Sequence, residues 1–201
     1  MSLPELFSRT LQPLDPDGTL APAAALLPGV GRTLEFDLET QSQTEWCWAA
    51  VGVGVSKFYK PAGNSLTQCR LANTELERDD CCGGGGATDC NVPTAPETVL
   101  AKTGNLDESK LDMMDSPASF QDVQNEILNG RPLCCGIGWI VGGGHLVVLH
   151  GASTDNSGGV VKQWVAVADP KYGPSDYLVE DFTDAYRQGA GQWLTSYFTR
   201  G

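Results

Sequence analysis

The amino-acid sequence predicts an α+β fold, because the two halves of its 201 residues carry different hydrophobic patterns. Residues 32–130 contain segments in which apolar side chains recur at helical spacing. Residues 131–201 contain short apolar runs separated by Gly, Pro, Asn and Asp, which is typical of strands. Hydrophobic residues make up 41 % of the chain and charged residues 19 %, as in globular proteins. We therefore expect a helical lobe followed by a stranded lobe.

The beginning of the chain, residues 1–31, is rich in Pro, Ala and Leu and has little periodicity, so we expect a leader or linker. Glu5, Asp15 and Asp17 lie where a secretory signal needs a positive region and an apolar core. This pattern argues against a Sec-type signal peptide and leaves a cytoplasmic location or export by a dedicated secretion system. No apolar run approaches the roughly 20 residues that a membrane-spanning helix needs.

The charge balance restricts the partners of the protein. Its 25 acidic and 13 basic residues give a formal net charge of −12. Such a surface repels nucleic acids and anionic membranes, so we expect neither as a partner. The acidic balance is compatible with basic peptide substrates, although it also serves solubility alone.

The first half begins with an alternation of apolar and acidic residues over 34–38, which predicts a half-buried strand. A helix is expected from Cys47 to about Tyr59, before Pro61. Residues 64–92 hold four cysteines and a glycine run, and they predict an irregular insert that needs bridges or a metal.

Two short helices and four strands are expected after the insert. The helices cover about 95–102 and 119–128, the second with Ser119 as its N-cap and Gly130 at its end. The expected strands are Leu133–Trp139, His145–His150, Val161–Ala168 and Tyr177–Phe182.

Seven cysteines leave the redox state of the protein open. They are Cys47, Cys69, Cys81, Cys82, Cys90, Cys134 and Cys135. The odd number suggests one free thiol, and the six others allow about 15 ways of forming three bridges. The missing secretory signal instead favours reduced thiols. The four cysteines of the insert could ligate zinc, but adjacent cysteines seldom reach one ion, so bridges or buried thiols are favoured.

Cys47 is the candidate nucleophile because it stands at the start of a predicted helix. A thiol with its ordinary pKa is only a few per cent thiolate at neutral pH. Lowering such a pKa to about 4 takes roughly 6 kcal/mol, whereas a helix dipole supplies about 0.3–2 kcal/mol. A neighbouring histidine is therefore required.

The chain offers two histidines, His145 and His150. His145 follows three glycines and opens an apolar strand, so we expect it to be the base. His150 lies five residues further along and points to the opposite face of a strand, where we expect a packed, hydrogen-bonded residue. Asp169 ends the next strand, and the two strands pair through a turn at 155–159. His145 and Asp169 lie nearly the same number of residues from that turn, so Asp169 is expected to orient the base.

Gln41 is the candidate donor to the oxyanion that forms during attack on a carbonyl. It lies six residues before Cys47, and one such donor stabilises the transition state by about 2.7–4 kcal/mol. Gln43, four residues before Cys47, is interpreted as a solvated loop residue.

These residues resemble the papain-like cysteine peptidases. That family has a Gln six residues before a Cys-Trp pair at the start of a helix, followed by His and then Asn or Asp, and Gln41, Cys47-Trp48, His145 and Asp169 match in that order. The wider sequence pattern is similar to that of the compact bacterial branch of the family, which includes plant-directed effector proteases and bacteriocin-processing peptidases.

The resemblance covers residues 32–200, and it implies a papain-like fold whose helical lobe carries the nucleophile and whose antiparallel β lobe carries His and Asp. It also implies a cysteine endopeptidase that acts on protein or peptide substrates without a cofactor or metal. Two departures separate the chain from plant and lysosomal papains. Thr44-Glu45-Trp46 replaces their Gly-Ser before the nucleophile, and the Cys-to-His separation is shorter than their usual ~130–150 residues.

Two other functions remain open at this stage. Transglutaminase-like acyl transferases share the order Cys, His, Asp, although the upstream Gln favours a peptidase. A cysteine-rich binding module without catalysis is the alternative outside the enzymes.

Overall fold

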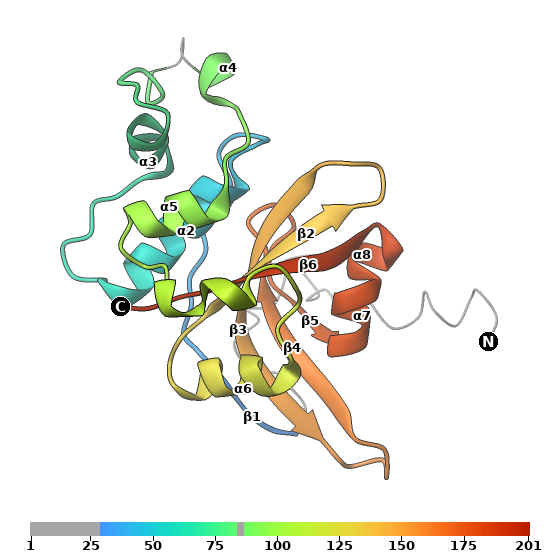
Figure 1. Ribbon diagram of the computed structural model, residues 1–201. Helices are drawn as coiled ribbons and strands as arrows, with labels where there is room; N and C mark the ends of the chain where they lie inside the picture. The colour runs from blue at the N-terminus through green and yellow to red at the C-terminus, as the bar shows by residue number, and fades with distance from the viewer. Residues whose placement is uncertain (1–28, 84–86) are drawn as a thin grey trace, which may run out of the picture.

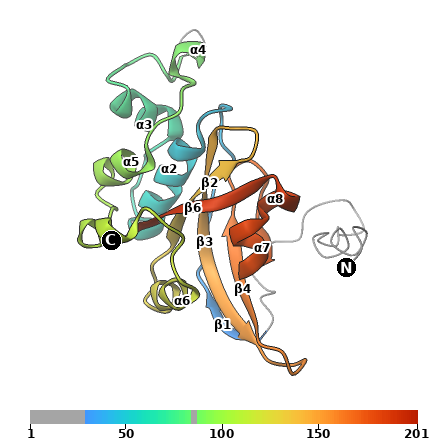
Figure 2. The same ribbon diagram turned by 45° about the vertical axis from the view of Figure 1, so that its right-hand side comes forward.

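A six-stranded antiparallel sheet forms the centre of the molecule. Five of its strands come from the second half of the chain, and helices pack on both of its faces (Figures 1 and 2). The computed structural model describes residues 29–83 and 87–201. Residues 1–28 of the expected leader lie outside the described residues. The helices and the antiparallel sheet form the expected α+β, papain-like fold.

The central strand of the sheet is β3, which carries His145. The strand order is β5-β4-β3-β2-β6, and β1 pairs with the part of β3 that extends past β2. The strands are β1 (Val30–Thr33), β2 (Leu133–Trp139), β3 (Gly144–Asp155), β4 (Lys162–Ala168), β5 (Ser175–Leu178) and β6 (Gly191–Phe198).

The helices form two groups. All but the last two come between β1 and β2 in the chain, and most of these lie on the left of Figure 1, whereas the last two lie between β5 and β6. They are α2 (Cys47–Tyr59), α3 (Gln68–Glu75), α4 (Ala87–Cys90), α5 (Pro96–Lys102), the 3-10 helix η3 (Glu108–Met113), α6 (Phe120–Leu128), α7 (Val179–Asp184) and α8 (Tyr186–Gly189). Within the described residues, no helix is long and apolar enough to cross a membrane.

Several predicted elements have their expected bounds. α2 runs from Cys47 to Tyr59, and β2 matches the predicted strand. α6 begins after Ser119, whose hydroxyl accepts a hydrogen bond from the Asp122 N–H, and Gly130 follows its end at φ +75°. These elements combine a clear apolar periodicity with a cap or a turn residue at their ends.

Three expectations about the elements are wrong, and one strand was not expected. The alternating segment 34–38 is extended, but the first strand is β1, and its ladder ends where Thr33 pairs with Gly151. The insert 64–92 contains the helix α3. The predicted strand 177–182 gives way to α7 at Val179, and β6 was not predicted. Alternating burial needs only an extended backbone with one covered face, so it does not by itself establish strand pairing.

Two apolar cores correspond to the two lobes. The first joins α2, α3 and α5 to one face of the sheet, and the second joins the other face to α6, α7 and α8. After β6 the chain returns to the helical lobe, where the Asn105 amide donates to the Arg200 carbonyl at 2.9 Å (Figure 1).

The cysteines pair differently from the expectation of a single free thiol. Cys69 bonds to Cys82 and Cys81 to Cys90, whereas Cys47, Cys134 and Cys135 are free. Cys134 and Cys135 are neighbours on β2, so their side chains point to opposite faces and lie in different cores. Burial raises the pKa of both thiols. They are inert packing residues of the sheet.

Candidate active site

Cys47 is the first residue of α2, and its side chain is half-buried. The N-cap residue, Trp46, makes no side-chain capping bond, and the first turn of the helix has no acidic residue. The positive end of the helix dipole therefore stays uncompensated at the sulfur. Trp46 and Trp48 are each 1 % exposed, and this burial fixes the backbone on both sides of the thiol.

The turn before Cys47 is closed by the side chain of Gln41. Its amide nitrogen donates to the carbonyls of Gln43 (2.8 Å) and Thr44 (2.7 Å), and its own backbone N–H donates to Pro170 O at 2.8 Å. Both protons of the amide are thus used within the turn. Gln43 is partly exposed and supplies only its carbonyl, which is compatible with its interpretation as a loop residue.

His145 lies near the beginning of β3, opposite Ile137 of β2. Its Nε2 donates to Asp169 Oδ1 at 2.9 Å, which leaves Nδ1 for the thiol of Cys47. Burial lowers the pKa of His145, but hydrogen bonds to Asp169 and Cys47 raise it more, and the net pKa is about 9. The ring is therefore an imidazolium at neutral pH.

Two aromatic rings enclose the imidazole. Trp139 stacks on His145 with ring centroids 5.7 Å apart, and Tyr172 meets it edge-on at 6.1 Å. Both shield the hydrogen bond between His145 and Asp169 from water, which strengthens it.

Asp169 follows the last residue of β4 and has a fully buried side chain. The Tyr186 hydroxyl donates to Oδ2 at 2.5 Å, and the backbone N–H groups of Lys171 (2.7 Å) and Tyr172 (3.0 Å) donate to Oδ1. Burial opposes ionisation, but the hydrogen bond and charge of His145 and the hydrogen bond of Tyr186 outweigh it and lower the pKa of Asp169. The carboxylate is thus kept charged next to the imidazolium.

The antiparallel pairing predicted for the His145 and Asp169 segments is present. β3 and β4 pair from Asp155 and Lys162 to Val148 and Ala168, with one irregularity between Leu149 and Gly151. This hairpin brings the two side chains into contact.

His150 lies away from this contact. Its Nδ1 donates to the Leu34 carbonyl at 3.1 Å, and burial lowers its pKa. It is a packed, hydrogen-bonded residue of β3, as the sequence predicts.

A cleft of about 600 Å³ runs between the two lobes at Cys47 and His145. The helical lobe supplies one wall and the glycine-rich ends of β2 and β3 supply the other. Lining residues are Thr44, Glu45, Cys47, Trp48, Pro93, Thr94, Pro96, Gly136, Ile137, Gly138, Trp139, Gly142, Gly143, Gly144, His145, Leu146, Lys171, Leu194, Thr195 and Tyr197. Residues of both lobes thus line the cleft on either side of the Cys47 thiol and the His145 ring.

A family model described as papain-like cysteine protease AvrRpt2 matches residues 30–187. The match covers most of the chain. The chain belongs to this family. It is therefore a cysteine protease, a hydrolase with protein substrates. No curated protein matches the sequence.

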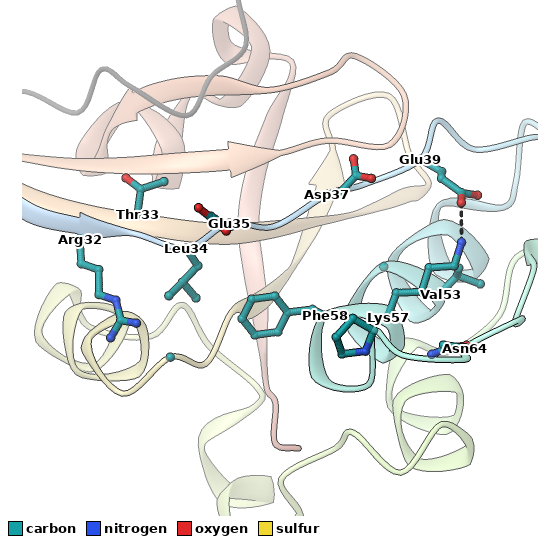
Figure 3. Close-up of a pocket in the computed structure, with 13 residues that line it drawn as sticks. Arg32, Thr33, Leu34, Glu35, Asp37, Glu39, Val53, Lys57, Phe58 and Asn64 are labelled. Atoms are coloured by element: carbon teal, nitrogen blue, oxygen red, sulfur yellow. Dashed lines mark hydrogen bonds and ion pairs between the residues drawn. The ribbon is translucent and has the colours of Figure 1, made fainter.

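This AvrRpt2-family protease has a second hollow, larger than the cleft. It measures about 810 Å³ and lies between the extended segment 32–39 and α2 (Figure 3). The described residues that line it include no cysteine or histidine. Its Lys57 ammonium and Glu39 carboxylate pair at 2.6 Å across the opening, as the dashed line in Figure 3 shows. Its chemistry is therefore that of a surface groove rather than a catalytic site.

Sequence reasoning missed the residues that support the site from α8 and β2. Tyr186 binds Asp169, Arg187 Nη2 lies 3.8 Å from Asp169 Oδ2, and Trp139 covers His145. Arg187 also lies over the Tyr172 ring at 4.5 Å and has φ +51°. Trp139 ends a predicted strand and could have been singled out, whereas Tyr186 and Arg187 lie in a segment without periodicity.

Proposed function

We propose that this protease is an endopeptidase in which Cys47, His145 and Asp169 act as a catalytic triad. The observation that carries the proposal is the continuous chain of contacts from Asp169 through the imidazole to the thiol, at the floor of a cleft between the lobes. A protonated His145 next to Cys47 favours the thiolate, and the helix dipole adds to this effect.

The reaction follows from the positions of the protons. The Cys47 thiolate attacks the scissile carbonyl carbon and forms a tetrahedral intermediate. His145 then gives the Nδ1 proton to the leaving amine, and the C–N bond breaks to leave an acyl-enzyme. Water loses a proton to His145, attacks the thioester and releases the acid and the free thiolate. Throughout the cycle, Asp169 accepts the hydrogen bond from the His145 Nε2–H and so keeps Nδ1 directed at the sulfur.

Two donors are proposed for the oxyanion. The first is the backbone N–H of Cys47, which lies at the first position of α2. It has no carbonyl partner within the helix and stands at the positive end of the helix dipole. Gln41 is the second, and for this role its amide must release the Gln43 or Thr44 carbonyl when substrate binds. A lower kcat in Gln41→Ala, under conditions in which the variant is fully folded, supports a role of the Gln41 amide in the transition state.

Acyl transfer to an amine is the competing reaction, since it uses the same nucleophile and base. The family description, a cysteine protease, favours water as the acceptor. The cysteine-rich binding module is disfavoured, because Cys69, Cys81, Cys82 and Cys90 are used in disulfides. Neither disulfide leaves a thiolate for a metal.

A peptide library tests the proposal. The full chain is incubated with the library in parallel with Cys47→Ala, and mass spectrometry records new termini. We expect internal cleavage with free carboxylates, abolished in Cys47→Ala. Products that carry an added amine instead of a free acid indicate acyl transfer, and cleavage that persists in Cys47→Ala contradicts the proposed nucleophile.

Iodoacetamide labelling provides a check that needs no substrate. We expect Cys47 to be alkylated at neutral pH much faster than Cys134 and Cys135, which are buried. The rate should fall in His145→Ala, since the imidazolium that favours the thiolate is lost. An unchanged rate in His145→Ala contradicts the ion pair.

A further inference from the structure

The turn that carries Cys47 is held by a distant segment of the chain, residues 90–92. This segment links α4 to α5 and runs past the beginning of α2 (Figure 1). The carbonyl of Cys90 accepts from the Trp46 indole N–H at 2.7 Å, and the carbonyl of Val92 accepts from the Trp48 indole N–H at 3.0 Å. The two tryptophans that flank the nucleophile are therefore oriented by the same segment.

Asn91 lies between these two carbonyls and contacts the turn with its side chain. Its Oδ1 accepts from the backbone N–H of Glu45 at 2.8 Å, and its Nδ2 donates to the Thr44 hydroxyl at 2.8 Å. One side-chain amide thus binds two consecutive residues, Thr44 and Glu45, just before Cys47 in the chain. Both of these residues line the cleft, whereas Asn91 is not among its described lining residues.

The two disulfides fix the segment that carries Asn91. Cys90, its neighbour in sequence, is bonded to Cys81, and Cys82 is bonded to Cys69 at the start of α3. Next to Cys69, the Gln68 amide accepts from the Ser42 N–H and donates to the Thr40 carbonyl, each at 2.9 Å. The turn is thus hydrogen-bonded from two sides by residues adjacent to a crosslink.

We propose that Asn91 is a positioning residue for the nucleophile: its side-chain amide holds the Thr44–Glu45 turn so that the Cys47 sulfur stays in reach of the His145 ring. This inference rests on the proposed function of Cys47 and His145. A nucleophile that is displaced by about 1 Å loses up to ~100-fold in rate, so a small relaxation of the turn is sufficient for a large effect.

The test compares Asn91→Ala with Asn64→Ala in the full chain. Asn64 is a matched control, because its amide also makes two hydrogen bonds in the helical lobe, to Ser56 Oγ (3.1 Å) and from the Leu66 N–H (3.0 Å), but none to the turn. We expect kcat to fall about 10-fold or more in Asn91→Ala, with KM within about 2-fold. Asn64→Ala should keep the parent kcat.

Alkylation of Cys47 by iodoacetamide as a function of pH supplies a readout that does not depend on hydrolysis. In Asn91→Ala the labelling profile should move to higher pH, because the sulfur and the imidazolium no longer meet. An unchanged profile and kcat overturn the proposal, and so do equal losses in Asn91→Ala and Asn64→Ala. A parent that labels Cys47 rapidly but cleaves no peptide contradicts the proposed function, while the labelling profile still tests Asn91.

Asn91→Asp serves if Asn91→Ala does not fold. The carboxylate keeps an acceptor for the Glu45 N–H and adds a negative charge beside the turn. Relative to the parent, we expect a lower kcat, because the donor to the Thr44 hydroxyl is lost, and a labelling profile shifted to higher pH, since the added charge disfavours a nearby thiolate. A profile identical to that of the parent overturns the proposal.

Discussion

The two sides of the active site are positioned by different kinds of structure. On the β lobe, His145 and Asp169 are 24 residues apart in one hairpin, and ladder bonds and buried side chains hold them. On the helical lobe, the turn before Cys47 is closed locally by Gln41 and receives side-chain hydrogen bonds from Gln68 and Asn91, 26 and 46 residues away, in an insert with two disulfides. The proposed base, His145, is held by regular secondary structure, whereas the proposed nucleophile, Cys47, is held by crosslinked loops.

This difference separates the effects expected of mutations on the two sides. Changes around Asp169 disturb a fully buried charge and should lower both stability and activity. Changes at Gln68, at Asn91 or in the disulfides of the insert remove no buried charge and should lower activity more selectively. Four predictions test this distinction.

The largest effect is expected for Asp169→Ala. The change removes the acceptor of the His145 Nε2–H and the Tyr186 hydroxyl, which are buried, and of two backbone N–H groups, which are partly buried. We expect about 3–5 kcal/mol of lost stability and at least about 100-fold lower kcat/KM. Urea unfolding and peptide hydrolysis measure the two losses. Asp169→Asn, which keeps the oxygen acceptor, should lose less stability, and equal losses in both variants contradict the assigned role of the hydrogen bonds.

Removing the disulfide next to Asn91 should have a smaller effect on stability. In the double variant Cys81→Ser/Cys90→Ser, the closed loop is lost, at a cost of roughly 2–4 kcal/mol. The segment 90–92 then loosens, so kcat should fall further than the unfolding curve explains at the assay temperature. Differential scanning calorimetry and hydrolysis rates measured on the same sample decide this. A fall in stability with unchanged kcat indicates that the insert does not position the nucleophile.

The pH dependence of stability tests the charge state on the β-lobe side. The pKa of His145 is raised to about 9 in the folded protein, above its ordinary value of about 6.5. The stabilising contribution is therefore complete below about pH 6.5 and is lost as the pH rises through 9. Asp169, with its lowered pKa, contributes in the opposite range and loses its contribution in acid.

Urea unfolding of the parent and of His145→Gln at pH 6 and pH 9.5 measures this contribution. The stability difference between the two proteins should be larger at pH 6. A difference that does not change with pH means that folding does not raise the pKa of His145.

The β-lobe half of the site could be predicted because its signals are local. Two apolar runs with a Gly- and Asn-containing turn between them predict a hairpin, and the pairing brings Asp169 to His145. The bounds of α2 were likewise predicted from a local signal, the recurring apolar residues that follow Cys47. The roles of the triad residues remain a proposal, although the contacts are those that the chemistry needs.

The support of the helical half could not be predicted, because it depends on long-range pairing. Six cysteines other than Cys47 allow about 15 full pairings, and the structure uses only two bridges. Nothing in the local sequence of Asn91 indicates that its amide contacts a turn 46 residues earlier. Tyr186 and Arg187 were missed for a local reason. The backbone angles of α8 are irregular, so its sequence has no periodicity that could have indicated them.

The smallest effect, and the control for the others, is expected for Ser119→Ala. Ser119 caps α6 through the Asp122 N–H at 3.1 Å, and α6 packs on the core of the β lobe away from the cleft. Loss of a cap costs about 1 kcal/mol, so the unfolding midpoint should fall while kcat and the Cys47 labelling profile stay at the parent values. Because this substitution lowers stability without touching either support of the site, a fall in kcat here would mean that activity simply follows global stability. The contrast between the hairpin and the crosslinked insert would then have no functional meaning.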